Sequence, residues 1–179
     1  ENVNFQKVLD NIKEYLGDKV VPFALPIGEA ESFKGVVNVI DETAKEYSGK
    51  DSKDVEIPDD IKDEVDSIRE MLIEKVAETE EELMEKYFEG EPFTEEELIR
   101  GIKKSIANGD LVPLIVGSAV QTMGVDILLD MIGKYVQNPS EVDANIGHIE
   151  DEEVERKFDV KEPFSAVVFK TIVDPFVGK

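Results

Sequence analysis

The stretch that most constrains the fold is the apolar run Leu111 to Ala119, which reads Leu-Val-Pro-Leu-Ile-Val-Gly-Ser-Ala. A run of this length that ends in small residues and precedes a helical pattern is typical of a strand buried on both faces of an α/β sheet. In open α/β sheets, ligands bind outside the carboxyl ends of such strands. We therefore expect Gly117, Ser118 and Ala119 to lie at a ligand site, although an ordinary strand-to-loop turn ends in the same residue types.

The composition supports a folded core and excludes several kinds of chemistry. Of the 179 residues, 41% are hydrophobic and none is cysteine, which excludes disulfides and thiol chemistry. No apolar run approaches the roughly 20 residues that span a bilayer, and residues 1–16 lack the basic and apolar regions of a signal peptide. We expect a soluble, cytoplasmic protein that makes no membrane contact.

Acidic side chains dominate the charge. There are 42 Asp and Glu against 20 Lys and Arg, a net charge of −22. Residues 54–97 contribute about two-thirds of it, because they hold 19 acidic and 4 basic residues, a net charge of −15. A field of this sign opposes binding to phosphate backbones and attracts basic protein surfaces. Direct binding of nucleic acid by this chain is therefore not expected.

The first third of the chain is expected to hold one helix and then short strands. Pro22 and Pro26 favour an edge strand or a bent strand, and Gly35 favours a bulge. The expected elements are a helix over residues 5–16, strands over 20–27, 33–40 and 43–47, and a polar loop over 49–57.

Helical patterns begin at Pro58, a residue type that suits the start of a helix. Thr79 with Glu82, and Thr94 with Glu97, match the capping-box pattern and predict two further helices. The expected helices cover residues 59–77, 80–88 and 95–107, and the apolar stripe of the first is Ile61, Val65, Ile68, Leu72 and Val76.

The last third is expected to hold a helix, a linker and a strand. The helix follows the central strand, and its apolar face consists of Val125, Leu128, Leu129, Ile132 and Val136. Residues 140–162 are acidic and aperiodic, which indicates a linker. Residues 164–172 are rich in β-formers, and Asp174-Pro175 with Gly178 indicates a turn.

Six short segments occur in a characteristic order along the chain. They are Glu1 to Phe5, Leu25-Pro-Ile-Gly28, Phe33-Lys-Gly-Val-Val37, Glu82-Leu-Met-Glu-Lys-Tyr87, Gly117-Ser-Ala119 with Gly124-Val125, and Glu162-Pro-Phe164 with Asp174-Pro-Phe-Val-Gly178. Together they resemble elongation factor G, a translational GTPase, or a close paralogue, and the resemblance covers essentially the whole chain.

The resemblance implies a partial α/β sheet of the phosphate-loop GTPase type, interrupted by an α+β insert. Residues 1–19 correspond to a GTPase-domain helix and residues 111–139 to the last strand and helix of the GTPase core. The remaining segments correspond to an inserted subdomain over 20–110 (strands about 20–47, helices about 59–107), an acidic linker over 140–162 and the first strand of a β-barrel domain over 163–179.

The resemblance also implies a function for the small-residue corner. Gly117, Ser118 and Ala119 match the motif whose backbone holds guanine, and an N–H aimed at the purine O6 accepts guanine and repels the amino group of adenine. The full-length protein is expected to bind GTP or GDP with magnesium and to hydrolyse GTP while it moves tRNA and mRNA on the ribosome. Val120 and Gln121 depart from the family pattern, in which an aromatic or aliphatic residue and then lysine follow.

Two motifs needed for GTP hydrolysis are missing from these residues. The chain contains neither Gly-x-x-x-x-Gly-Lys-Ser/Thr nor Asn-Lys-x-Asp. Phosphoryl transfer needs a phosphate cradle, a magnesium ion and a residue that positions water. The isolated chain is therefore expected to have no activity and to hold no nucleotide or metal tightly.

The acidic helices are the second candidate site. Asp66, Glu70, Glu74 and Glu78 are spaced four residues apart and so line one ridge of the helix, away from its apolar stripe. By resemblance, this insert docks the basic C-terminal domain of the ribosomal stalk protein. A solvated acidic face would show the same pattern.

Two other functions fit the sequence. The chain resembles translational GTPases that protect or recycle ribosomes as well as those that translocate. It is also compatible with a non-catalytic acidic module that binds proteins, since the phosphate loop is missing. The single histidine, His148, lies in the expected linker and has no nucleophile near it in the sequence, so it is expected to be an exposed side chain.

Overall fold

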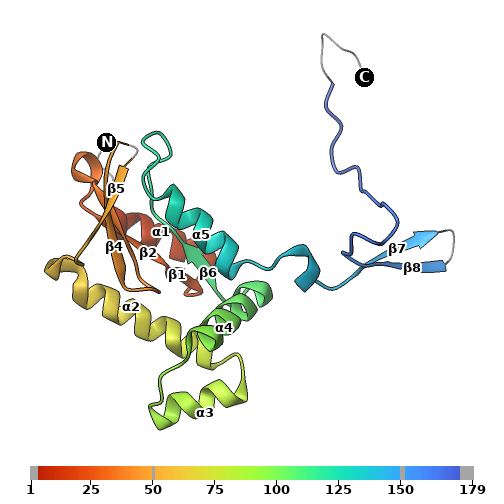
Figure 1. The fold of residues 1–179 in the computed structure, drawn as a ribbon, viewed down its shortest axis with the longest axis horizontal. Helices are drawn as coiled ribbons and strands as arrows, with labels where there is room; N and C mark the ends of the chain where they lie inside the picture. Colours follow the sequence, from red (N-terminus) through yellow and green to blue (C-terminus); the bar gives the residue numbers. More distant parts are fainter. Residues whose placement is uncertain (1–3, 50, 150–151, 174–179) are drawn as a thin grey trace. The chain divides into compact units, whose positions relative to one another are not determined.

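The computed structural model describes residues 4–49, 51–149 and 152–173 (Figure 1). The chain divides into two compact units, residues 1–136 and residues 137–179. The mixture of helices with small sheets confirms the expected fold class for the first unit. No closed barrel is present in the described part of the chain.

Short strands and longer helices make up the first unit. Its strands are β1 (Val20–Pro22), β2 (Ala24–Ile27), β3 (Gly35–Asn38), β4 (Thr43–Ser48), β5 (Asp51–Val55) and β6 (Val112–Leu114). Its helices are α1 (Phe5–Leu16), α2 (Asp59–Ala77), α3 (Glu81–Glu89), α4 (Glu95–Asn108) and α5 (Val125–Tyr135), with a 3-10 turn η1 (Ala30–Ser32). Every helix expected in this unit is present close to its expected bounds.

The expected strand over residues 20–27 is in fact two strands that separate at Phe23 and enter different sheets. β1 pairs in parallel with β6, and β2 is an edge strand of the antiparallel sheet β2-β3-β4-β5. The Phe23 amide donates to the Leu114 carbonyl at 2.8 Å, and the Phe23 carbonyl accepts from the Val39 amide at 3.0 Å. Phe23 thus ties the parallel pair to the antiparallel sheet.

Two expectations within the antiparallel sheet are wrong. Gly35 is not a bulge, since it pairs in regular register with Ile27 and Glu46. A Cβ there would lie 2.4 Å from the Lys45 carbonyl oxygen, so the glycine is required by the close approach of β4. Residues 49–57 are not a loop throughout, because β5 pairs antiparallel with β4. β5 is an exposed polar edge strand, so its side chains lack the alternation that marks a half-buried strand.

The stripe that the sequence indicates on α2 is buried, with Val65, Ile68, Leu72 and Val76 inside and Ile61 half-buried. The Thr94–Glu97 capping box at α4 is confirmed. The one expected at α3 is wrong: Glu80 is the N-cap residue, without a side-chain hydrogen bond, and the Thr79 hydroxyl donates instead to the Val76 carbonyl at 2.7 Å.

The apolar face assigned to α5 is also wrong. Ile127, Met131 and Tyr135 are the side chains buried in the core, and Tyr135 packs edge-on against Phe23 with ring centroids 5.9 Å apart. Four of the five residues expected in the core are instead exposed to solvent: Leu128, Leu129, Ile132 and Val136. Because α5 is apolar on more than one side, helical periodicity alone does not identify the face that is buried.

The central strand is shorter and less buried than expected. β6 covers three residues, and residues 112–116 are half-buried, while Leu111 just before the strand is fully buried. In the described part of the chain, β6 has β1 as its single strand neighbour. A strand at the edge of a two-stranded pair cannot be covered as fully as the centre of a wide sheet, so burial on both faces is not observed.

The second unit differs most from its expected structure. The expected linker contains a 3-10 turn η2 (Pro139–Glu141) and an antiparallel hairpin of β7 (Asn145–Ile149) and β8 (Glu152–Arg156). Residues 164–172 form neither helix nor strand, and their large apolar side chains are exposed. A β-rich segment needs a partner strand to become a sheet. The expected turn at residues 174–178 lies outside the described residues.

Candidate functional site

The segment Gly117 to Gly124 forms a closed loop between β6 and α5. The Ser118 amide donates to the Met123 carbonyl at 3.0 Å, and the Met123 amide donates back to the Ser118 carbonyl at 3.1 Å. The Thr122 amide donates to the Ala119 carbonyl at 3.3 Å. A side-chain hydrogen bond within the loop is local, from the Thr122 hydroxyl to the Gln121 carbonyl at 2.7 Å, so the loop's shape depends mainly on its backbone and its two ends.

Two glycines allow this loop to close. A Cβ on Gly117 would lie 2.8 Å from the Met123 carbonyl oxygen, and one on Gly124 would lie 2.8 Å from the Val116 carbonyl oxygen. Gly124 also has a φ of +75°, a conformation that L side chains rarely adopt. Both positions therefore require glycine, and the small-residue corner seen in the sequence has a structural reason.

The structure distinguishes the three residues predicted at the corner. Gly117 and Ala119 are exposed and Ser118 is half-buried, so the corner can be reached from solvent. The Ser118 amide is already used by Met123, whereas the Gly117 and Ala119 amides donate to no residue in the described part of the chain. Gly117 and Ala119 are therefore the predicted site residues whose N–H groups are available to a ligand, and Ala119 is the one that lies within the closed part of the loop.

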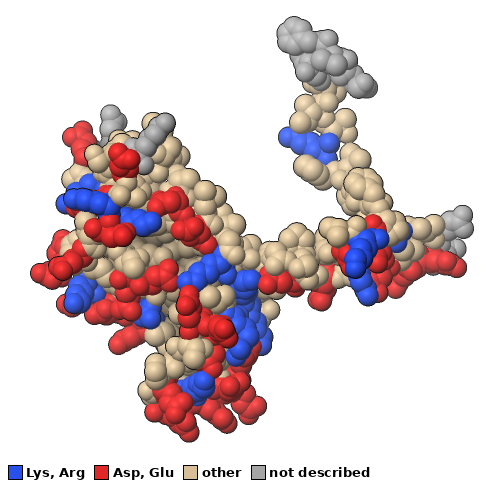
Figure 2. Space-filling model, in the orientation of Figure 1, with Lys and Arg blue, Asp and Glu red and all other residues tan. Residues whose placement is uncertain are grey.

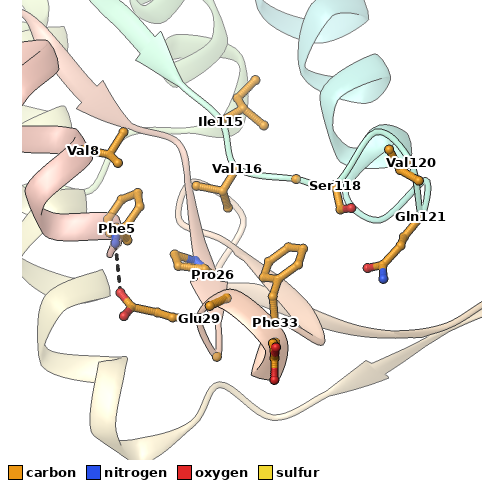
Figure 3. A pocket seen from close by; sticks show the side chains of 14 residues that line it. Phe5, Val8, Pro26, Glu29, Phe33, Ile115, Val116, Ser118, Val120 and Gln121 are labelled. Carbon is orange, nitrogen blue, oxygen red and sulfur yellow. Dashed lines mark hydrogen bonds between the residues drawn. The ribbon is translucent and has the colours of Figure 1, made fainter. Parts of the chain in front are cut away.

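A cavity of about 640 Å³ adjoins the corner (Figure 3). Three segments meet around it: the start of α1, the end of β2 with its connection to β3, and residues 115–118 with 120–121. Its walls are largely apolar, and two carboxylates, Glu29 and Glu31, are among its lining residues. Glu29 accepts a hydrogen bond from the Phe5 amide at 2.9 Å and so caps α1. The apolar lining residues include Phe5, Val8, Pro26, Phe33, Ile115 and Val116.

Sequence reasoning missed Glu29 and a second acidic residue, Asp126, which lies in the first turn of α5. Its two carboxylate oxygens accept from the Tyr47 hydroxyl at 2.7 Å and from the Lys45 ammonium at 3.0 Å. Burial raises the pKa of Asp126, but these hydrogen bonds outweigh burial and leave the pKa below its ordinary value. Lys45 and Tyr47 are on β4, so only the folded chain reveals this contact.

The acidic ridge is exposed for the most part, as expected. Asp66, Glu70 and Glu74 lie on α2 and Glu78 is its C-cap residue, and none of the four forms an ion pair within the described residues. The Arg69 guanidinium, on the same helix, pairs with Glu42 at 3.1 Å and not with a carboxylate of the ridge. Figure 2 shows acidic side chains gathered over α2 and α3, with basic side chains nearer α4.

Other candidate chemistry is not supported. Among the described residues, no group of three or more His, Asp or Glu side chains could hold a metal ion. His148 is exposed on β7, as expected. No helix in residues 4–49, 51–149 and 152–173 is long and apolar enough to cross a membrane.

Comparisons with known proteins agree with the fold. No protein-family model matches the chain. An elongation factor G-like protein of Thermotoga maritima is 38% identical over 180 residues, which cover 100% of this chain and 26% of that protein. A crystal structure of a protein from Thermus thermophilus superposes with a TM-score of 0.70 at 29% identity, covering 77% of this chain and 21% of that chain.

By these matches, the chain has the fold and sequence of a translation elongation factor. Within that class, it belongs to the elongation factor G-like family. The resemblance stated from six short segments is thereby confirmed. The chain spans about a quarter of the length of its Thermotoga relative.

Proposed function

We propose that this chain supplies the guanine-reading loop and a partner-docking insert to a translational GTPase that drives translocation on the ribosome. The observation that carries the proposal is the unpartnered Ala119 amide in a glycine-closed loop between a strand and a helix. Guanine presents an acceptor at O6, where adenine presents an amino donor. An N–H at this corner therefore favours guanine.

The described residues do not supply the phosphate-binding half of such a site. They contain no metal-holding group, and the sequence contains no phosphate loop, so no step of GTP hydrolysis can be derived from them. We propose that the phosphates and magnesium are held by other parts of the full-length protein, and that the isolated 179-residue chain has no GTPase activity.

Calorimetric titration tests this division. The full-length protein is expected to bind GDP and GTP and to reject ADP and ATP, while the isolated chain is expected to show no tight binding of either. Micromolar affinity of the isolated chain for GDP would contradict the division. Equal affinity of the full-length protein for GDP and ADP would contradict guanine reading itself.

A second candidate is a related GTPase that protects or recycles ribosomes. The observation that favours it is the pair Val120 and Gln121 after Ala119, which departs from the elongation factor G pattern. A translocation assay with full-length protein separates the two, because only a translocase advances the tRNAs at every round of GTP hydrolysis.

We further propose that the ridge Asp66, Glu70, Glu74 and Glu78 docks the basic C-terminal domain of the ribosomal stalk protein. The solvent access of these carboxylates and their lack of ion pairs within the described residues support this. Like charges four residues apart cost a few tenths of a kcal/mol per pair in a helix. A cationic partner would relieve that repulsion.

A further inference from the structure

The starting observation is that α5 is fastened to the antiparallel sheet at its first turn. Asp126 has both carboxylate oxygens engaged, one by the Tyr47 hydroxyl at 2.7 Å and one by the Lys45 ammonium at 3.0 Å. The side chains of Lys45 and Asp126 are 31% and 40% exposed, so the cluster is half-buried. A carboxylate held on both oxygens cannot rotate freely, and the first turn of α5 is fixed with it.

The second step links that turn to the loop. Asp126 follows Gly124 by two positions, and the Cβ position of Gly124 is 3.2 Å from a methyl carbon of Val36 on β3. The same Cβ position is 3.4 Å from the Gly117 Cα, at the other end of the loop. The closed end of the loop therefore rests on β3, and the helix that continues from it is held by β4.

The third step concerns the ionisation of the cluster. The hydrogen bond with Asp126 raises the pKa of Lys45, and burial together with the same carboxylate raises the pKa of Tyr47. Both groups therefore keep their protons at neutral pH, while Asp126 stays ionised. The two donors and the acceptor remain matched, so the contact persists over the whole physiological pH range.

We propose that Lys45 and Tyr47 are positioning residues for guanine nucleotide: by holding Asp126 they fix the start of α5 and, through Gly124, the orientation of the Ala119 amide. The inference rests on the proposed function of the loop. It also gives the insert a physical connection to the nucleotide, because β4 belongs to the insert and α5 continues from the base-reading loop.

The test uses the full-length protein carrying Lys45→Met and Tyr47→Phe, with GDP dissociation followed by a fluorescent GDP analogue. The expected result is dissociation faster by about threefold to thirtyfold, the range typical of residues that couple sites without touching the ligand. Lys45→Arg keeps the cation, and GDP is expected to dissociate from this variant almost as slowly as from the unaltered protein.

Lys134→Met is the matched control. Lys134 lies in the last turn of α5, where it pairs with Asp41 at 3.2 Å and Glu95 at 3.0 Å. It fastens the other end of the same helix to the same insert, far along the helix from the loop. Its loss is expected to lower stability without changing GDP dissociation. Equal acceleration by both variants, or no acceleration by Lys45→Met with Tyr47→Phe, would overturn the proposal.

Hydrogen exchange at the Ser118 and Met123 amides gives a readout that does not need nucleotide. In the full-length protein without nucleotide, these amides are expected to exchange faster in the Lys45→Met, Tyr47→Phe variant than in Lys134→Met. Unchanged exchange there would overturn the positioning role. If the unaltered protein binds no guanine nucleotide but the exchange responds, the proposed function fails while the physical link between β4 and the loop stands.

Discussion

Glu97 serves two partners at once, and this makes it the most informative single residue of the helices α2 to α4. Its carboxylate accepts the Thr94 amide at 2.8 Å in the capping box of α4 and also pairs with the Lys86 ammonium of α3. The Lys86 hydrogen bond and then the Thr94 amide lower the pKa of Glu97 to about 2. The capping box could be predicted from spacing, whereas the contact with Lys86 depends on how α3 folds back.

The lowered pKa of Glu97 gives a pH-dependent stability. Since the folded pKa is about 2 and the ordinary value is 4.5, the ionised carboxylate stabilises the fold fully above pH 4.5. This contribution is lost as the pH falls through about 2. Urea unfolding of the unaltered protein and of Glu97→Gln should therefore differ most near neutral pH and converge in acid. A difference that does not change with pH would contradict the assignment.

Gly117 provides a test of the loop backbone. Gly117→Ala is expected to destabilise the protein by about 1–3 kcal/mol, because the new methyl group would lie 2.8 Å from the Met123 carbonyl oxygen. Gly133→Ala is the matched control, since a Cβ there meets nothing within 4 Å in α5. The control is expected to stabilise the helix by about 0.5–1 kcal/mol. Denaturant unfolding measures both, and a stabilising Gly117→Ala would disprove the tight contact.

Among the helices, the two expected capping boxes give different predictions for stability, because one forms and the other does not. Thr94→Ala removes a cap that is present and should cost about 1 kcal/mol of unfolding free energy. Glu82→Ala should change it by less than about 0.5 kcal/mol, because the Thr79–Glu82 box does not form and Glu82 is exposed. Thermal unfolding of both variants measures this. A larger loss for Glu82→Ala would mean that α3 is capped in another way.

Helices could be predicted well and polar strands could not, for physical reasons. The bounds of α2 and α4 follow from Pro58, the capping box at Thr94 and the buried stripe, all of which are local signals. β5, β7 and β8 are exposed hairpin strands held by backbone hydrogen bonds, so their side chains carry no alternating pattern. Periodicity misidentifies the buried face of α5 because tertiary packing buries Ile127 and Met131 rather than the equally apolar Leu128 and Leu129.

At the scale of the whole molecule, the net charge of −22 should govern association with a basic partner. Glu74→Lys with Glu78→Lys is expected to slow association with the stalk protein C-terminal domain by about tenfold at low salt, with a smaller effect at high salt. Glu14→Lys with Asp10→Lys, on the exposed side of α1, makes the same charge change away from the ridge and should have little effect. If stopped-flow association rates fall equally in both variants, the net charge of the protein and not the ridge controls association, and the docking proposal is wrong.

The candidate site was only partly visible in the sequence. Gly117, Ser118 and Ala119 could be located because a buried-strand pattern ended in small residues, and the structure leaves this corner accessible to solvent. Glu29 and Asp126 could not be located, since their partners lie on other elements and are distant along the chain. That the Ser118 amide is occupied while the Gly117 and Ala119 amides are free for a ligand depends on the hydrogen bonds of the folded loop.

The most direct test of the central claim is the guanine selectivity of the full-length protein after Ala119→Pro, which deletes the one N–H assigned to the base. Ser118 forms a β-bridge with Met123, so its extended backbone suits the residue before a proline. GDP affinity is expected to fall by about tenfold relative to the unaltered protein, whereas Gln121→Ala, in the same loop, should leave it nearly unchanged. Full retention of GDP affinity and of discrimination against ADP in Ala119→Pro would contradict the account.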